Sequence, residues 1–133
     1  MKNTKIGKID TTELNVPPEK HEYETAKYFA NRGHNVKFIK PHYVQGLNNP
    51  DFEICGKAWE TKSPTRFSNS TFEFNFKKAV KQSPHIIFDL RRLSADDEKL
   101  YIKNIKKRAM VSKAKDIIII TKDGRKFDIK GKF

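Results

Sequence analysis

The sequence predicts an α/β fold in which helices flank a mixed central β-sheet. Segments with the apolar spacing of an α-helix alternate along the chain with short segments that have the pattern of strands. The 133 residues are enough for one domain with a modest core. We therefore expect the element order α-β-β-β-α-β, followed by a further helix and a terminal β-hairpin.

The first part of the chain is expected to be a linker or N-terminal arm. Residues 1–18 are polar, lack sustained periodicity and end in two prolines, which stiffen the approach to the first helix. The folded domain is expected to span residues 19–133. Its first helix is predicted over 19–32 and a short strand over 34–40. The apolar stripe predicted for this helix comprises Tyr23, Ala26, Phe29 and Ala30.

The second half of the chain contains residue patterns that mark the beginnings of two helices. Ser70 and Glu73 form a capping-box pattern that predicts the start of the second helix, and Ser94 precedes an acidic first turn that predicts the third. Buried strands are expected at 85–90 and 116–121, and a terminal strand at 126–130. The core stripe of the second helix should contain Phe72, Phe76 and Val80.

The charge of the chain indicates the class of its partner. Lys and Arg number 28 against 16 Asp and Glu, which gives a net charge of +12. A surface this positive is expected to bind a polyanion. Nucleic acid is the leading candidate, because each phosphate neutralised by Lys or Arg releases counterions and adds affinity. A solvated, Lys-rich surface is the alternative. The single cysteine allows no disulfide within the chain, and no apolar run predicts a membrane span or secretory signal.

Residues 50–64 predict a hairpin that gathers acidic side chains. A two-residue turn at either Cys55-Gly56 or Gly56-Lys57 gives the same faces, because opposed strand residues share a side. One face then carries Asp51, Glu53, Glu60 and Lys62, and the other Phe52, Ile54 and Trp59. Three neighbouring carboxylates repel each other unless a cation or the lysine offsets the charge.

The order Pro50-Asp51, eight residues, then Glu60-Thr61-Lys62 resembles the motif of the PD-(D/E)XK nuclease superfamily. The resemblance implies an α-β-β-β-α-β core, a metal-dependent phosphodiester cleavage site and a further carboxylate from the first helix. Glu22 matches this last position best, and Glu19 and Glu24 remain alternatives. Ala26 and Phe29, four and seven residues after Glu22, lie on the packing side of the helix, so Glu22 is expected to face the sheet.

A narrower resemblance extends from about Lys20 to Ile129. The segments KHEYETAKYFANRGHNVKFIKP, PDFEICGKAWETKSP, HIIFDLRR and IIIITKDG look like the C-terminal nuclease domains of contact-dependent growth inhibition toxins and related polymorphic toxins. This group is associated with cleavage of transfer RNA. If the chain is such a toxin, a neutralising immunity protein should exist, and it is expected to be acidic to match this basic surface. The domain itself is expected to be a monomer. The resemblance also implies action in the cytoplasm of a target cell, after delivery as the end of a larger secreted or phage-borne protein.

The chemistry expected at the site follows from the residue types. Asp51 and Glu60 would hold a hard divalent cation, Mg²⁺ or Mn²⁺, through carboxylate oxygens. Lys62 could help to deprotonate the attacking water, or could stay charged and bind phosphate. Both roles remain open. Substrate contacts are expected from Asn75 and Gln82 on the second helix and from Arg91 and Arg92 after the strand that follows.

Three functions fit the sequence. The first is a metal-dependent ribonuclease toxin acting on transfer RNA, and the second is a DNA endonuclease with the same core. The third is a non-catalytic basic nucleic-acid-binding module. Acidic side chains grouped where phosphate must approach disfavour this third function.

Overall fold

The structure is a computed structural model that describes residues 5–41 and 49–133. The chain divides into two compact units, Met1–Trp59 and Glu60–Phe133. The described part is a mixed α/β protein with three helices and seven strands. Within it, no helix is long and apolar enough to cross a membrane.

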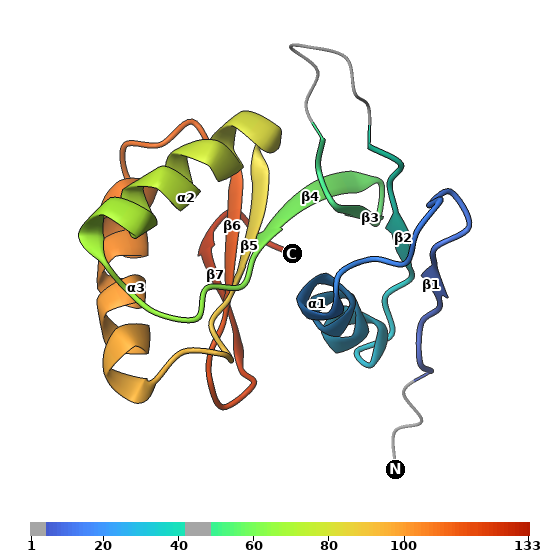
Figure 1. Cartoon of the computed structure of the whole chain (residues 1–133), viewed down its shortest axis with the longest axis horizontal. Coiled ribbons are helices and arrows are strands. Elements are labelled where there is room, and N and C mark those ends of the chain that lie inside the picture. Colours follow the sequence, from blue (N-terminus) through green and yellow to red (C-terminus); the bar gives the residue numbers. More distant parts are fainter. Residues whose placement is uncertain (1–4, 42–48) are drawn as a thin grey trace. The chain divides into compact units, whose positions relative to one another are not determined.

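The first unit packs one helix beside short strands (Figure 1). Strand β1 runs parallel to β2, whereas β2, β3 and the beginning of β4 are antiparallel neighbours. The helix contacts β1 and β2. The bounds of these elements are β1 (Ile9–Asp10), α1 (Lys20–Ala30), β2 (Val36–Phe38), β3 (Phe52–Ile54) and β4 (Lys57–Lys62).

Strand β1 lies within the segment that was expected to be an arm. The Gly7 N–H donates to the Ala30 carbonyl at 2.7 Å, and the Val36 N–H donates to the Lys8 carbonyl at 2.8 Å. A β-carbon at Gly7 would lie 1.9 Å from the His34 carbonyl oxygen, so the close approach requires glycine. This stretch of the chain therefore belongs to the folded unit.

The predicted apolar stripe of α1 is wrong at its first position. Tyr23 is 40% exposed, whereas Ala26, Phe29 and Ala30 are buried as expected. Thr25 and Tyr28 take the remaining inward positions. Thr25 can be buried because its hydroxyl donates to the His21 carbonyl at 3.1 Å, one helical turn earlier.

The hairpin adopts one of the two predicted registers. Phe52 pairs with Trp59 and Ile54 with Lys57, which leaves Cys55 and Gly56 as the turn. Both turn residues have positive φ, 51° and 78°, as a type I′ turn requires. The predicted division of the hairpin into an apolar face and a polar face is confirmed within this unit. Phe52, Ile54 and Trp59 are buried, and Glu53 is exposed.

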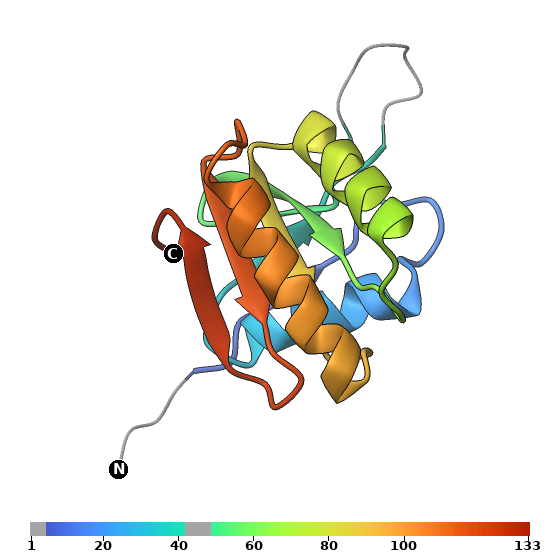
Figure 2. The same cartoon turned by 90° about the vertical axis from the view of Figure 1, so that its left-hand side faces the viewer.

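The second unit continues from β4 into a sheet covered on one face by two helices (Figure 1, Figure 2). The end of β4, β5 and β6 are parallel, and β7 pairs antiparallel with β6. Rings of Phe72, Phe76, Phe88 and Tyr101 contact each other in the core between helices and sheet. The bounds are α2 (Asn69–Gln82), β5 (His85–Asp89), α3 (Ala95–Ala109), β6 (Asp116–Ile120) and β7 (Lys126–Lys130).

One helix cap agrees with the prediction and the other does not. The Ser94 hydroxyl accepts from the Asp97 N–H at the start of α3, as expected. At α2 the cap is Ser68, which accepts from the Thr71 N–H at 3.2 Å, so the capping box at Ser70 is wrong. Ser68 has the extended backbone that a capping residue needs, whereas Ser70 already lies inside the helix.

Replacing Ser68 with Ala should therefore lower the free energy of unfolding by about 1 kcal/mol, because one N–H of the first turn loses its acceptor. Ser70→Ala is the matched control, since this serine is exposed and does not cap the helix. Urea unfolding of the two variants measures the difference. An equal loss in both would contradict the assignment of the cap.

Candidate functional site

The first unit brings two of the predicted site residues together. Asp51 directly precedes β3, where its N–H donates to the Trp59 carbonyl at 2.8 Å and its carbonyl accepts from the Ile39 N–H at 3.1 Å. Glu22 lies in the first turn of α1. Burial raises the pKa of Glu22 to about 7, helped by the charge of Asp51 and by a hydrogen bond between the two carboxyl groups. The two carboxyl groups are therefore close neighbours.

The other glutamates of α1 are placed differently. The side chain of Glu19 is 72% exposed and lies 3.4 Å from the His21 ring nitrogen Nε2. Glu24 is also exposed. Of the three helix glutamates considered from the sequence, only Glu22 is partly buried beside Asp51.

A cavity of about 250 Å³ in the first unit contains this carboxyl pair in its lining. One wall comes from residues 14–18, which the sequence analysis did not include in the site. This segment lacks the sustained periodicity of a helix or strand. The features that could have indicated a packed wall are the two apolar residues Leu14 and Val16 and the two prolines that follow them. The remaining lining comes from Glu19, Phe38, Ile39, Lys40, Pro41, Asn49 and Pro50.

The second unit holds the other predicted pair, Glu60 and Lys62. The Lys62 Nζ lies 3.2 Å from Glu60 Oε2, and their side chains are 19% and 7% exposed. Two residues apart on β4, they point to the same side of the strand. Glu60 pairs with Ile86 and Lys62 with Phe88, so all four share the face that α2 and α3 cover. The ion pair offsets part of the cost of burying each charge there.

Helix α2 reaches this face, although its polar residues have partners of their own. The rings of Phe76 and Phe88 stack at 5.8 Å, which places α2 over β5. Asn75 is partly buried, and its amide opposes the rise in the pKa of Tyr101 that burial causes. Gln82 is the last residue of the helix and is partly buried.

The two arginines after β5 differ in their contacts. The Arg91 guanidinium donates twice to the buried Asp89 carboxylate, at 2.9 Å from Nε and 2.7 Å from Nη2. Arg92 donates from Nη1 to the carbonyl of Ser63 at 3.0 Å. Ser63 follows Lys62 directly, so Arg92 is bound to the chain at the end of β4 that carries Lys62.

The carboxylates are suitable ligands for a divalent cation. Across residues 5–41 and 49–133, no group of three or more His, Cys, Asp or Glu side chains is arranged to hold a metal. Mg²⁺, however, is often bound by one or two carboxylates, with waters and substrate phosphates as the other ligands. The Glu22–Asp51 pair has the right donor atoms. A cation would relieve the repulsion by Asp51 that adds to the effect of burial on the pKa of Glu22.

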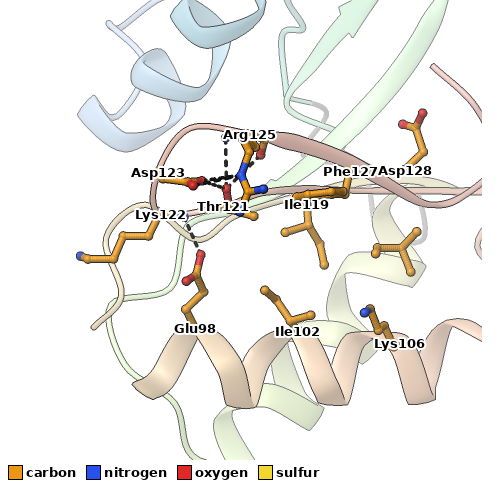
Figure 3. A pocket seen from close by; sticks show the side chains of 11 residues that line it. Glu98, Ile102, Lys106, Ile119, Thr121, Lys122, Asp123, Arg125, Phe127 and Asp128 are labelled. Carbon is orange, nitrogen blue, oxygen red and sulfur yellow. Dashed lines mark hydrogen bonds and ion pairs between the residues drawn. The ribbon is translucent and has the colours of Figure 1, made fainter. Parts of the chain in front are cut away.

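A second cavity, of about 720 Å³, lies in the second unit between α3 and strands β6 and β7 (Figure 3). None of the predicted site residues lines it. The charged side chains at its rim pair locally, since Asp123 accepts from Arg125 Nε at 2.9 Å and from the Thr121 hydroxyl. These contacts close the turn between β6 and β7.

Comparisons with known proteins place the chain in a family. A model of the contact-dependent growth inhibition CdiA C-terminal domain matches residues 48–125, more than half of the chain. Curated protein sequences gave no match. Among solved structures, the fold is similar to a CdiA-CT/CdiI toxin and immunity complex from Burkholderia pseudomallei. The TM-score is 0.67 at 23% identity, over 93% of this chain and 99% of that chain. The chain therefore belongs to the contact-dependent growth inhibition CdiA C-terminal domain family, as a growth-inhibition toxin domain.

Proposed function

We propose that this toxin domain is a metal-dependent endonuclease that hydrolyses phosphodiester bonds in transfer RNA. The observation that carries the proposal is the pair of neighbouring carboxyl groups at Glu22 and Asp51, beside a cavity. Perturbed carboxyl groups in a cavity are typical of catalytic sites. The motif Asp51, Glu60-Thr61-Lys62 adds an acidic residue and a lysine from the same hairpin.

Asp51 and Glu60 would hold Mg²⁺ or Mn²⁺, and Glu22 would support Asp51 as a further carboxylate. When bound, the cation would stabilise the charge that builds on the phosphate and would lower the pKa of a bound water. Lys62 would act beside it, either by accepting a proton from the attacking water or by binding a phosphate oxygen. The ion pair with Glu60 keeps the lysine at this position on β4.

We assign the substrate contacts to four residues of the second unit, which also contains Glu60 and Lys62. Arg92 is the strongest candidate because it is bound next to Lys62 and is exposed beyond the end of β5. Arg91 could contribute only the donors that Asp89 does not use. Asn75 and Gln82 would contact phosphate or orient the region around Lys62. The net charge of +12 supports a nucleic acid as substrate.

An immunity protein is proposed as the protein partner. The similar solved structure is a complex of a toxin with its immunity protein. A partner for a chain with 28 basic and 16 acidic residues is expected to be acidic, because complementary charge speeds association and favours the correct partner. We further propose that the domain acts in the cytoplasm of a target cell, delivered as the end of a larger protein.

The test is to incubate the protein with total RNA and with plasmid DNA, with Mg²⁺ or with a chelator. Loss of only the transfer RNA bands, in Mg²⁺ and not in the chelator, is the expected result. Nicking of the plasmid instead would favour a DNA endonuclease. Absence of cleavage with either substrate and any divalent metal would contradict the proposal.

A further inference from the structure

The solvent-facing side of α1 carries an arrangement that the proposed catalytic site does not use. Lys20, Tyr23 and Lys27 are spaced three and four residues apart, so they lie along one side of the helix. All three residues are exposed, and Tyr23 is 40% exposed. An aromatic ring between two lysines is the combination with which proteins bind single-stranded nucleic acids.

These three side chains line a groove of about 690 Å³ within the first unit. Its other side is formed by the segment from Thr11 to Pro18. Glu24 also lines it, so two lysines face one carboxylate and the groove favours an anion.

The segment opposite α1 is held in place, so the groove exists before any ligand binds. Strand β1 pairs with β2, and Lys37 Nζ lies 2.8 Å from Glu13 Oε2. The Leu14 N–H donates to the Thr11 carbonyl at 3.0 Å, which closes a turn at the beginning of the wall. A preformed groove avoids much of the cost of ordering a loop on binding.

The groove adjoins the cavity of the carboxyl pair. Residues 14–18 line both hollows, and Glu22 in the cavity is the neighbour of Tyr23 in the groove. A ligand in the groove and a phosphate in the cavity would therefore contact the same short segment of the chain.

We propose that this groove binds a single-stranded stretch of the RNA substrate next to the bond that is cleaved. A base stacks on the Tyr23 ring, and Lys20 and Lys27 bind the flanking phosphates. Stacking requires a base that is already unpaired, so the groove selects loops and ends over duplex RNA. This inference rests on the proposed nuclease function, because it assigns the neighbouring cavity to the scissile phosphate.

The test measures the affinity of a fluorescent single-stranded oligoribonucleotide in the Asp51→Asn background without divalent cations, so that cleavage is slow during the measurement. Tyr23→Ala should weaken binding about 5-fold to 150-fold, since stacking contributes ~1–3 kcal/mol per base. Tyr23→Trp should retain the affinity. Replacing Lys20 and Lys27 with Gln should reduce the slope of log affinity against log salt by about 0.7 for each lysine.

Phe74→Ala is the matched control, because Phe74 is an exposed aromatic on α2 with Lys78 Nζ 5.8 Å from its ring. It should change the affinity less than about 2-fold, and unfolding curves should show that each variant remains folded. Equal losses for Tyr23→Ala and Phe74→Ala would overturn the proposal. So would an equal effect of Tyr23→Ala on duplex RNA.

The two proposals fail in different ways. If the wild type cleaves no nucleic acid and Tyr23→Ala still weakens RNA binding, the nuclease function is wrong and the groove remains a binding site. If the wild type cleaves transfer RNA and Tyr23→Ala binds the oligoribonucleotide as well as wild type, the groove assignment is wrong.

Discussion

Replacing Asp51 with Asn should lower the rate of transfer RNA cleavage by about 10²–10³-fold, and Lys62→Gln should have a similar effect. Asn keeps the shape of the side chain but loses the charge that would hold a cation. Gln removes the cationic group beside the phosphate. Rates are measured with saturating Mg²⁺ on purified transfer RNA.

Glu53→Gln is the control for these variants, because Glu53 belongs to the same hairpin and is exposed. Its rate should stay within about 2-fold of wild type. If Glu53→Gln loses as much activity as Asp51→Asn, the residues assigned to the site are wrong.

The double variant tests whether the two pairs act as one site. Groups that act as a unit have non-additive effects, so the rate of Asp51→Asn/Lys62→Gln should fall little below that of the slower single variant. Multiplication of the two single effects would mean that Asp51 and Lys62 act independently, against the proposal.

The second large effect is expected on stability at alkaline pH. Burial and the Asp51 charge raise the pKa of Glu22 from 4.5 to about 7. Between these values the folded protein binds more protons than the unfolded chain, so stability falls as the pH rises through this window. The contribution of protonated Glu22 is fully present below pH ~4.5 and is lost above pH ~7.

Glu22→Gln stays neutral and avoids this loss. Because Glu22 is only partly buried, solvent screens part of the effect, and the gain in free energy of unfolding at pH 8 should be about 1–2 kcal/mol. At pH 4 the variant and the wild type should be equally stable. Urea unfolding without divalent cations, at both pH values, measures this difference.

Glu24→Gln is the matched control on the same helix, since Glu24 is exposed, and it should change stability by less than about 0.5 kcal/mol at either pH. A gain for Glu22→Gln that is the same at pH 4 and pH 8 would contradict the raised pKa and the carboxyl pair behind it.

Features governed by neighbouring residues could be predicted from the sequence. The strands β5, β6 and β7 and the Ser94 cap follow from apolar patterning, turn residues and capping chemistry, which act over a few positions. The hairpin faces follow from the same local geometry, because a residue two positions along a strand always returns to the same side. The sequence did not decide between the two possible turns. The structure has the turn at Cys55 and Gly56, where both residues adopt positive φ.

The sequence by itself therefore determined the order of the elements from α1 onward, the opposed faces of the acidic hairpin and the residue types of the proposed site. Only the tertiary structure decided which residues meet across long separations in the chain. It placed Glu22 against Asp51, brought residues 14–18 to the cavity and turned Tyr23 toward solvent. The physical reason is that burial and pKa depend on neighbours supplied by other elements, and local periodicity contains no information about those neighbours.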